Sequence, residues 1–422
     1  MINFIVKKLL SNRVVYRIAK NAYESNKAST CNPANYDIPE ITPFNFVKSN
    51  VDARRINLFV PALSEKHVFG GIATALRFFE AIRHDFPLAR IIVTDEVSVE
   101  LKAGQFYSDW QLTDLSGADC AENCIVVAGN RSGASLNVAE NDYFVSTAWW
   151  TAYNTFKALA WQSAMFGTQG RKSIYFIQDY EPGFYAWSSR FALADSTYAH
   201  AEQTIPVFNT ALLKDFFINS GYVFNEHYFF EPRINPVLSA ACEQAASVDK
   251  DRKILVYGRP GVERNLFNIV VLALRAWAQA YDKAEQWTIV SAGESHADIE
   301  LGRGVKLESL GKLTLDQYIH QLSTSSVGLS LMLSPHPSYP PLEMASFGIR
   351  VVSNGYANKK LSARSKNIIE PANFTPESIA ESLIKLCEEH ENASTVIYED
   401  NLFSKETEFS FAKNIVQNIL GE

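Results

Sequence analysis

Two cationic side chains stand beside glycines in positions that suit phosphate binding. Arg259 follows Gly258 in the run YGRPG, directly after an apolar stretch that is typical of a strand. Lys312 follows a glycine in a later loop, just ahead of a helix that Thr314 can cap. A guanidinium grips phosphate through its planar fork, and a lysine nearby adds a second positive charge. The pair predicts a diphosphate clamp. Arg264 could replace Arg259 in it or lie on the helix surface, and Lys312 taken alone is more typical of a surface lysine.

A proline-rich loop, SPHPSYPPLEMASFG at residues 334–348, is the most specific candidate site. Its prolines stop the preceding strand and force an extended loop, after which a helix is expected from Leu342 to Phe347. Glu343, in the first turn of that helix, could accept hydrogen bonds from the sugar hydroxyls of a nucleotide. The alternative is a favourable interaction with the helix dipole alone.

Polar and aromatic residues crowd the end of an earlier strand in YFIQDYEPGFY, residues 175–185. Asp179 and Glu181 could imitate the DxD metal motif of another transferase class, but no further metal ligands stand nearby. We therefore expect this segment to contact a sugar or nucleotide. The alternative is a buried aromatic cluster in which Asp179 caps the turn at Gly183.

A glycine pair precedes the first expected helix in the run KHVFGGI, residues 66–72. With Gly70 and Gly71 at this place, backbone N–H groups could approach an anion at the helix N-terminus. The run lacks the third glycine of a dinucleotide fingerprint and the GK[ST] of a P-loop. A tight strand-to-helix turn is therefore an equally good interpretation.

Strands that alternate with helices are expected to position these residues. The expected strands are Ile56–Val60, Arg90–Thr94, Cys124–Ala128, Ser173–Ile177 and Ile205–Phe208, then Lys253–Tyr257, Trp287–Ser291, Val327–Met332 and Arg350–Ser353. Helices are expected at Gly71–His84, Thr210–Ser220, Asn265–Tyr281, Leu315–Ser323 and Thr375–Glu389. This alternation predicts an α/β protein with two Rossmann-like domains that face each other across a cleft, where ligands bind near the carboxyl ends of the strands.

The strand-free stretch SAACEQAASVDKDRK marks the expected boundary between these domains. The predicted organisation is an N-terminal basic helix and linker at 1–50, a first domain at 51–240, a second domain at 250–395, and a helix within 396–422 that packs back on the first domain. Residues 1–27 carry five basic residues before any acidic one, so they predict either a helix on an anionic membrane surface or a helix packed on the protein.

Composition narrows the classes of function. The chain has 422 residues, a net charge of −7 and 47% hydrophobic residues, which excludes a disordered protein and argues against a general nucleic-acid binder. No uncharged apolar run approaches the length of a membrane span, and the N-terminal segment is a poor secretory signal because lysines interrupt it. The five cysteines have irregular spacing and no nearby histidine ligands, so we expect reduced thiols in a cytoplasmic protein and no metal site.

Taken together, these motifs resemble the retaining glycosyltransferases of the GT-B fold and of family 4. The early GG loop, the strand–GRP–helix unit, the later GK and PPLEMASFG occur in the expected order between Arg55 and the end of the chain. The set FIQDYEPGFY, YGRPG, GK and SYPPLEMASFG is closer still to the WsaF-type bacterial rhamnosyltransferases that depend on dTDP-rhamnose.

The resemblance implies a role for each matching position. Arg259 and Lys312 would hold the donor diphosphate beside Gly258 and neutralise the leaving group. The other donor-binding positions implied are Glu343 for the ribose, Tyr339 in the donor pocket, Tyr180 on the sugar or acceptor side, and Gly70 and Gly71 facing the phosphates or the acceptor. Asp179 would position the acceptor.

The resemblance also implies an activity. The protein would transfer L-rhamnose from dTDP-β-L-rhamnose to a hydroxyl of a growing bacterial surface glycan such as O-antigen, with retention and without metal or cofactor. The acceptor would be a lipid-linked oligosaccharide at the inner face of the cytoplasmic membrane, with residues 1–27 making peripheral contact. The alternatives are a different sugar nucleotide, or a non-catalytic subunit that binds nucleotide sugar or glycan.

One position departs from the family pattern. Family 4 usually has a second Glu eight positions before the one matched by Glu343, where it contacts hydroxyls of the transferred sugar. Here that position is Pro335. The change weakens the case for an ordinary hexose donor, favours a 6-deoxy sugar, and also raises the alternative of an inactive relative.

Overall fold

The computed structural model describes residues 37–64, 70–101, 107–117, 119–245, 248–392, 397–399 and 401–421. Contacts divide the chain into two units, residues 1–42 and 43–422. The described part of the first unit holds one 3₁₀ turn, Pro39–Ile41. The predicted basic segment 1–27 lies outside the described residues, as does residue 31, one of the five cysteines.

The first domain is built on a parallel sheet. Its strands are β2 (Arg55–Val60), β3 (Leu88–Val93), β4 (Gln111–Asp114), β5 (Cys124–Val127), β7 (Asp142–Ser146), β8 (Ser173–Ile177), β9 (Thr204–Asn209) and β10 (Tyr228–Phe230). They run in the order β10-β9-β8-β7-β2-β3-β5-β4. The central strands are buried along their whole length, which is why they appear in the sequence as continuous apolar runs. A small parallel pair, β1 (Asn45–Lys48) and β6 (Ser135–Val138), stands apart from this sheet.

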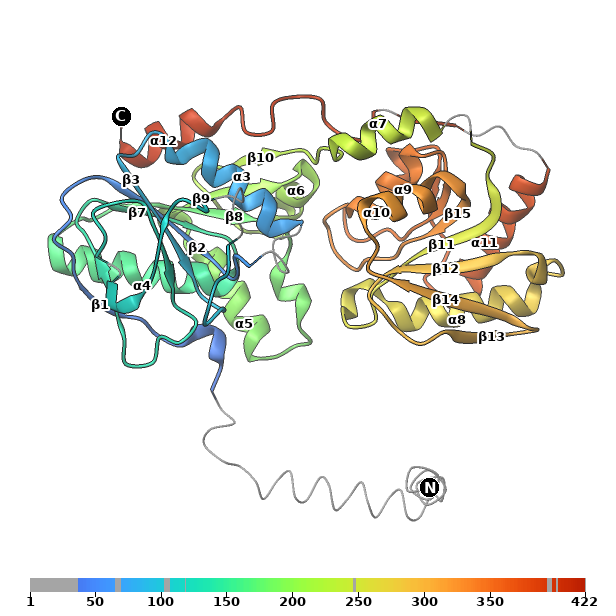
Figure 1. Cartoon of the computed structure of the whole chain (residues 1–422), viewed down its shortest axis with the longest axis horizontal. Helices are drawn as coiled ribbons and strands as arrows, with labels where there is room; N and C mark the ends of the chain where they lie inside the picture. Colours follow the sequence, from blue (N-terminus) through green and yellow to red (C-terminus); the bar gives the residue numbers. More distant parts are fainter. Residues whose placement is uncertain are drawn as a thin grey trace, which may run out of the picture. The chain divides into compact units, whose positions relative to one another are not determined.

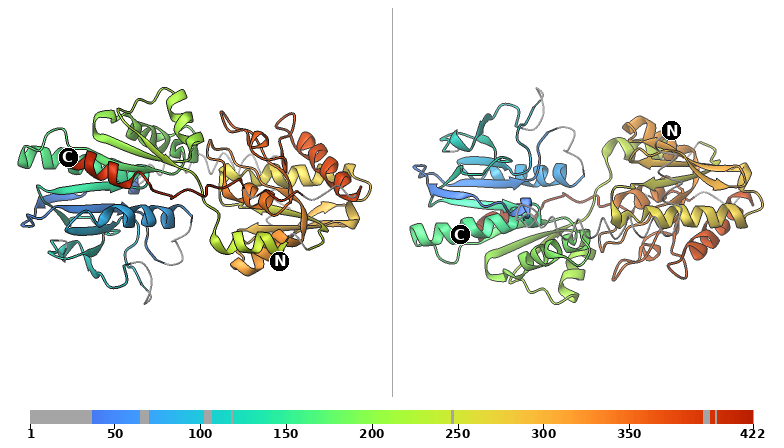
Figure 2. Two further views of the ribbon diagram at one scale, coloured as in Figure 1. Left: turned by 90° about the horizontal axis from the view of Figure 1, so that it is seen from above. Right: turned by 90° about the horizontal axis from the view of Figure 1, so that it is seen from below.

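Helices bury both faces of this sheet. Helix α3 (Gly71–Arg83) lies in the same apolar cluster as α12 (Ala412–Leu420), so the C-terminal helix packs on the first domain (Figures 1 and 2). Helices α4 (Trp149–Phe166) and α6 (Ala211–Asn219) contribute to a separate cluster. The short helix α5 (Ser189–Ser196) follows the segment that carries Asp179.

A buried charge cluster lies where two strands of the first sheet begin. Arg55, the first residue of β2, donates from Nε and Nη2 to the two carboxylate oxygens of Asp142, the first residue of β7, at 2.7 and 2.9 Å. Arg90 lies 3.6 Å from the same carboxylate, and all three side chains are fully buried. This cluster links the neighbouring strands β7, β2 and β3 near their amino ends. The candidate site lies at the opposite, carboxyl ends of the strands.

The second domain has a seven-stranded sheet. Its strands are β11 (Asp251–Gly258), β12 (Thr288–Gly293), β13 (Ile299–Gly302), β14 (Val305–Gly311), β15 (Ser325–Leu329), β16 (Arg350–Val352) and β17 (Ile368–Ile369), in the order β13-β14-β12-β11-β15-β16-β17. Only β13 among these is antiparallel to its neighbour. The helices are α7 (Pro236–Ala245), α8 (Phe267–Ala280), α9 (Leu315–Thr324), α10 (Tyr339–Ser346) and α11 (Pro376–Glu391).

The α/β class with two Rossmann-like domains is therefore confirmed. The described residues of the expected boundary segment hold no strand until β11 begins at Asp251, but its first half belongs to α7. Helix α10 begins at Tyr339, three residues before the expected start, because prolines fit the first turn of a helix. The sequence analysis did not predict helices α4, α5 and α7, nor strands β1, β4, β6, β7, β10, β13, β14 and β17.

Candidate functional site

The candidate residues of the second domain follow three strands, β11, β14 and β15, of a run of four adjacent strands. In this sheet β14 pairs with β12, β12 with β11, and β11 with β15, all parallel. Arg259 follows β11, Lys312 follows β14, and the proline-rich loop follows β15. The fold therefore places them along one edge, where an open α/β sheet binds its ligands.

Arg259 is held by a carboxylate that the sequence did not single out. Its Nε and Nη2 both lie 3.2 Å from Oε1 of Glu294, and each side chain is about a third exposed. The other oxygen, Oε2, accepts the backbone N–H of Gly261 at 2.7 Å. Glu294 is the first charged residue after β12, which is the signal that could have identified it. Glu294 therefore holds both the backbone at Gly261 and the guanidinium of Arg259 in place.

Gly258 is required by close packing at the end of β11. A Cβ at this residue would lie 2.0 Å from Oγ of Ser291 and 3.0 Å from the ring of Phe267. The glycine thus lets β11 and β12 approach each other at the point where Arg259 leaves the sheet.

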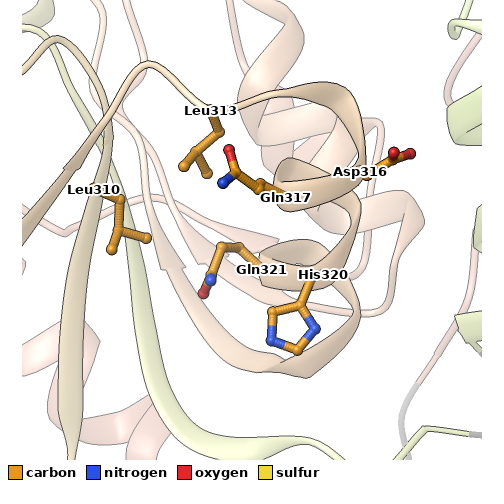
Figure 3. A pocket seen from close by; sticks show the side chains of 6 residues that line it. All are labelled: Leu310, Leu313, Asp316, Gln317, His320 and Gln321. Carbon is orange, nitrogen blue, oxygen red and sulfur yellow. The ribbon is translucent and has the colours of Figure 1, made fainter.

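Lys312 is exposed at the beginning of α9. It follows Gly311, whose φ of +64° favours glycine, and Thr314 caps the helix in a box with Gln317. A cavity of about 450 Å³ opens along α9 (Figure 3). Its lining residues are Leu310, Leu313, Asp316, Gln317, His320 and Gln321, so it does not include the predicted clamp.

Glu343 is paired with Tyr318. The Tyr318 hydroxyl of α9 donates to Oε2 of Glu343 in α10 at 2.8 Å. Burial raises the pKa of Glu343 to about 7, although the tyrosine hydrogen bond acts in the opposite direction. Tyr339 is half-buried nearby: its ring centre lies 5.8 Å from that of His336, and burial raises its pKa to about 12.

Asp179 connects the two domains. It is 8% exposed and follows β8, and its Oδ1 accepts hydrogen bonds from the Ser334 hydroxyl and the Tyr180 backbone N–H. Oδ2 lies 3.6 Å from Nε of Arg264. The N–H of Gly183 bonds the Tyr180 carbonyl, so the turn there is closed by backbone rather than by Asp179.

Arg264 contacts the first domain instead of lying on a helix surface. It belongs to the 3₁₀ turn Glu263–Asn265, and its guanidinium lies 4.2 Å from the ring centre of Phe184. Together with its ion pair to Asp179, this contact places Arg264, a second arginine besides Arg259, at the carboxyl ends of β11 and β8.

The other polar residues of the 175–185 segment turn inward. Glu181 accepts the Tyr175 hydroxyl at 3.2 Å, and burial raises the pKa of Glu181 to about 8. Its carboxyl is therefore poorly suited to a metal-binding DxD motif. The Tyr180 hydroxyl bonds Asp195 and Tyr222, and its ring packs in the aromatic cluster of the first domain. Tyr180 is thus part of this aromatic cluster, and its contact with a sugar or acceptor stays a prediction.

The glycine pair begins α3, as expected. Gly70 is its N-cap with a φ of +44°, and a Cβ on Gly71 would lie 2.6 Å from Oε1 of Gln178. Gly71 therefore allows the helix to approach the end of β8. The predicted loop residues 66–69 lie outside the described part of the chain.

The proline-rich loop contains buried polar groups that the sequence did not distinguish. Ser334 and His336 are 3% and 7% exposed. Lys359 is also buried, donates from Nζ to the Met332 carbonyl at 2.7 Å, and has its pKa lowered to about 8 by burial. The prolines allowed the loop to be predicted, but the spacing of its residues did not indicate which side chains are buried.

Three simple features of the described residues bear on the sequence expectations. The described cysteines, Cys120, Cys124, Cys242 and Cys387, are free thiols. No group of three His, Cys, Asp or Glu in the described ranges is arranged to hold a metal ion. Within those same ranges, no helix is long and apolar enough to cross a membrane.

Comparisons with known proteins identify both domains. Residues 55–211 match the family model described as WsaF, N-terminal domain, and residues 252–384 match WsaF, C-terminal domain. O-antigen biosynthesis protein RfbC of Myxococcus xanthus is 29% identical over 302 residues, which are 70% of this chain and 21% of that protein. The chain thus spans about a fifth of that relative.

Solved structures share the fold. Sucrose-phosphate synthase from Thermosynechococcus elongatus superposes with a TM-score of 0.52 at 10% identity, over 87% of this chain and 100% of that one. WaaG, a glycosyltransferase involved in lipopolysaccharide biosynthesis, gives 0.51 at 11% identity over the same shares. Anabaena HepE, solved with UDP and glucose, gives 0.50 at 12% identity, over 87% of this chain and 96% of that one.

Proposed function

Because the chain belongs to the GT-B glycosyltransferases built from the WsaF N- and C-terminal domains, we propose that it transfers L-rhamnose from dTDP-β-L-rhamnose to a hydroxyl of a growing bacterial surface glycan. Transfer proceeds with retention and without a metal ion. The observation that carries the proposal is the edge of the second sheet, where Arg259, Lys312 and Glu343 follow neighbouring strands inside the matched C-terminal domain.

The physical task is to expel a nucleoside diphosphate from the anomeric carbon. Negative charge grows on the phosphate as the bond breaks, and fixed cations there lower the barrier. Arg259 suits this role because Glu294 already orients its guanidinium, so little ordering remains when the phosphate arrives. Lys312 and the N-terminus of α10 add positive charge, and the departing phosphate helps to deprotonate the acceptor.

Glu343 and Tyr339 are proposed to recognise the nucleotide. An ionised Glu343 accepts hydrogen bonds from ribose hydroxyls, and its link to Tyr318 holds the carboxylate in place. Pro335 occupies the position where family 4 has a sugar-binding Glu, which supports a 6-deoxy sugar as the transferred group. Asp179 is proposed to position the acceptor from the first domain.

The acceptor side of the proposal rests on the relative. RfbC is named for O-antigen biosynthesis, so the acceptor proposed here is a lipid-linked oligosaccharide of that class. Residues 1–27 would then contact the inner face of the cytoplasmic membrane. Flotation with anionic vesicles, comparing the full chain with one that lacks residues 1–27, tests this contact.

The first experiment is thermal stabilisation by a panel of nucleotides and nucleotide sugars without added metal. A ligand at about 100 times its Kd stabilises the folded state by about 3 kcal/mol, and the readout needs no acceptor. We expect dTDP and dTDP-rhamnose to raise the Tm of the wild type and of Arg275→Ala, an exposed arginine on α8, but not of Arg259→Ala.

Each other outcome changes the proposal. A preference for UDP compounds (the HepE structure holds UDP) would replace the donor and keep the chemistry. Binding without any donor hydrolysis or transfer would favour a non-catalytic subunit. No response to any nucleotide would refute the transferase proposal.

A further inference from the structure

His336 carries a hydrogen-bond donor that no described residue of the protein uses. The side chain is 7% exposed, and its Nε2 is buried with no hydrogen-bond partner among the residues that the structure describes. Buried polar groups are almost always paired, so an unpaired one at a candidate site calls for an explanation. Its place after β15, at the edge that carries Arg259, suggests a ligand as the missing partner.

The protonation of the ring follows from its other nitrogen. Nδ1 lies 3.0 Å from the backbone N–H of Ser338 and accepts its hydrogen, so Nδ1 carries no proton. Burial lowers the pKa of His336 to about 4, with Lys359 and Arg264 acting in the same direction and Asp179 opposing them. The ring is therefore neutral at pH 7, and its single proton is on Nε2.

The loop around His336 is fixed on both sides. The backbone N–H of His336 donates to Oγ of Ser334 at 3.0 Å, and that hydroxyl donates in turn to Asp179 of the first domain. Ser338 has a φ of +69°, a strained value for a non-glycine residue, and its N–H is the one that the imidazole accepts. The donor on Nε2 is thus held in one orientation before any ligand binds.

We propose that the Nε2–H of His336 donates a hydrogen bond to a hydroxyl oxygen of the transferred sugar. This assignment rests on the proposed function, and it specifies that His336 contacts the sugar part of the nucleotide-sugar donor. The transferred sugar must lie between the diphosphate and an acceptor held by the first domain. The loop of His336 is the part of the second domain that Ser334 ties to Asp179.

The neutral charge of the ring suits a sugar hydroxyl. Asp179, Lys359 and Arg264 already place charged groups around His336, and a neutral imidazole adds a hydrogen-bond donor without a further charge. A neutral donor matches an uncharged hydroxyl, whereas diphosphate is better served by Arg259 and Lys312.

Two substitutions of His336 test the roles of its two ring nitrogens separately. In His336→Asn, the amide oxygen can occupy the place of Nδ1 and accept the Ser338 N–H, but no donor reaches the place of Nε2. In His336→Gln, the longer side chain brings an amide N–H to the place of Nε2, but the acceptor for Ser338 is lost. A sugar-binding role and a structural role therefore predict opposite orders of damage.

Calorimetric titration of the full chain with dTDP and with dTDP-rhamnose is the test. We expect His336→Asn to weaken dTDP-rhamnose binding about tenfold, the effect of losing one hydrogen bond, and His336→Gln to remain within about threefold of the wild type. Affinity for dTDP should be unchanged in both. An equal loss for both ligands, a larger loss in His336→Gln, or no loss in His336→Asn would overturn the proposal.

Spectroscopy of the wild type keeps the proposal testable if either variant is poorly folded. The imidazole ¹⁵N resonance of Nε2 should shift on addition of dTDP-rhamnose but not of dTDP, and identical spectra with the two ligands would overturn the assignment. If the wild type binds no nucleotide at all, the proposed function itself fails, and that result is distinct from any difference between the two variants.

Discussion

Glu343 offers a prediction in which stability and ligand binding change in opposite directions with pH. Burial raises its pKa to about 7 in the folded protein, against the ordinary value of 4.5 for a glutamate. Between these two values the folded state holds a proton that the unfolded state has lost. Its contribution to stability is therefore fully present below about pH 4.5 and is lost as the pH rises through about 7.

The size of this effect follows from the shift of the pKa. A difference of about 2.5 pH units, at about 1.4 kcal/mol each, amounts to about 3 kcal/mol. Glu343→Gln keeps the shape of the side chain but cannot ionise. As the pH rises from 4.5 to 8, we expect the free energy of unfolding of this variant to increase by about 3 kcal/mol relative to that of the wild type. For a domain of this size, this corresponds to roughly 6–12 °C in Tm.

The assay is thermal melting of both proteins from pH 4.5 to pH 8.5, with titration of dTDP at each pH. Stability of the wild type should fall relative to Glu343→Gln as the pH rises, while its affinity for dTDP should increase, because the ionised carboxylate is the proposed acceptor for ribose hydroxyls. Tyr318→Phe is the control for the hydrogen bond alone. A difference in Tm between the wild type and Glu343→Gln that stays constant over this range would refute the reasoning.

Two further predictions concern the sheets that position the site. Asp142→Asn should destabilise the first domain by about 3–5 kcal/mol in urea unfolding, because it leaves Arg55 and Arg90 buried without a counter-charge; a change below about 1 kcal/mol would contradict this. Gly258→Ala should cost about 1–3 kcal/mol in the same assay, since its Cβ would lie 2.0 Å from Oγ of Ser291. Adding Ser291→Ala should recover part of that loss, and no recovery would show that another contact causes it.

The sequence allows the strands to be located because most are buried runs of apolar residues. Ser173–Ile177 was expected with the bounds that the structure has, and β9 extends Ile205–Phe208 by one residue at each end. Helix α4 was missed for a physical reason. Its buried positions include Thr151, Asn154 and Gln162, so its inward face does not appear as an apolar stripe.

The site was only partly predictable. Glycine and proline patterns revealed where strands end and loops begin, and therefore the neighbourhoods of Arg259, Lys312 and Glu343. Contacts between distant segments left no such pattern: Asp179 and Ser334 are 155 residues apart, and their hydrogen bond depends on the packing of two domains. The partner of Arg259 was missed because Glu294 follows β12, a different strand from the one that Arg259 follows.

The return of α12 to the first domain has a consequence for biosynthesis. Phe409 packs with Phe78, Phe176 and Phe230, so the core of the first domain includes residues near the end of the sequence. At about 5–20 residues per second, a ribosome needs roughly 10–40 s to proceed from β10 to α12. During that interval the nascent first domain exposes an aromatic surface that chaperones can bind, while the second domain can fold in the meantime.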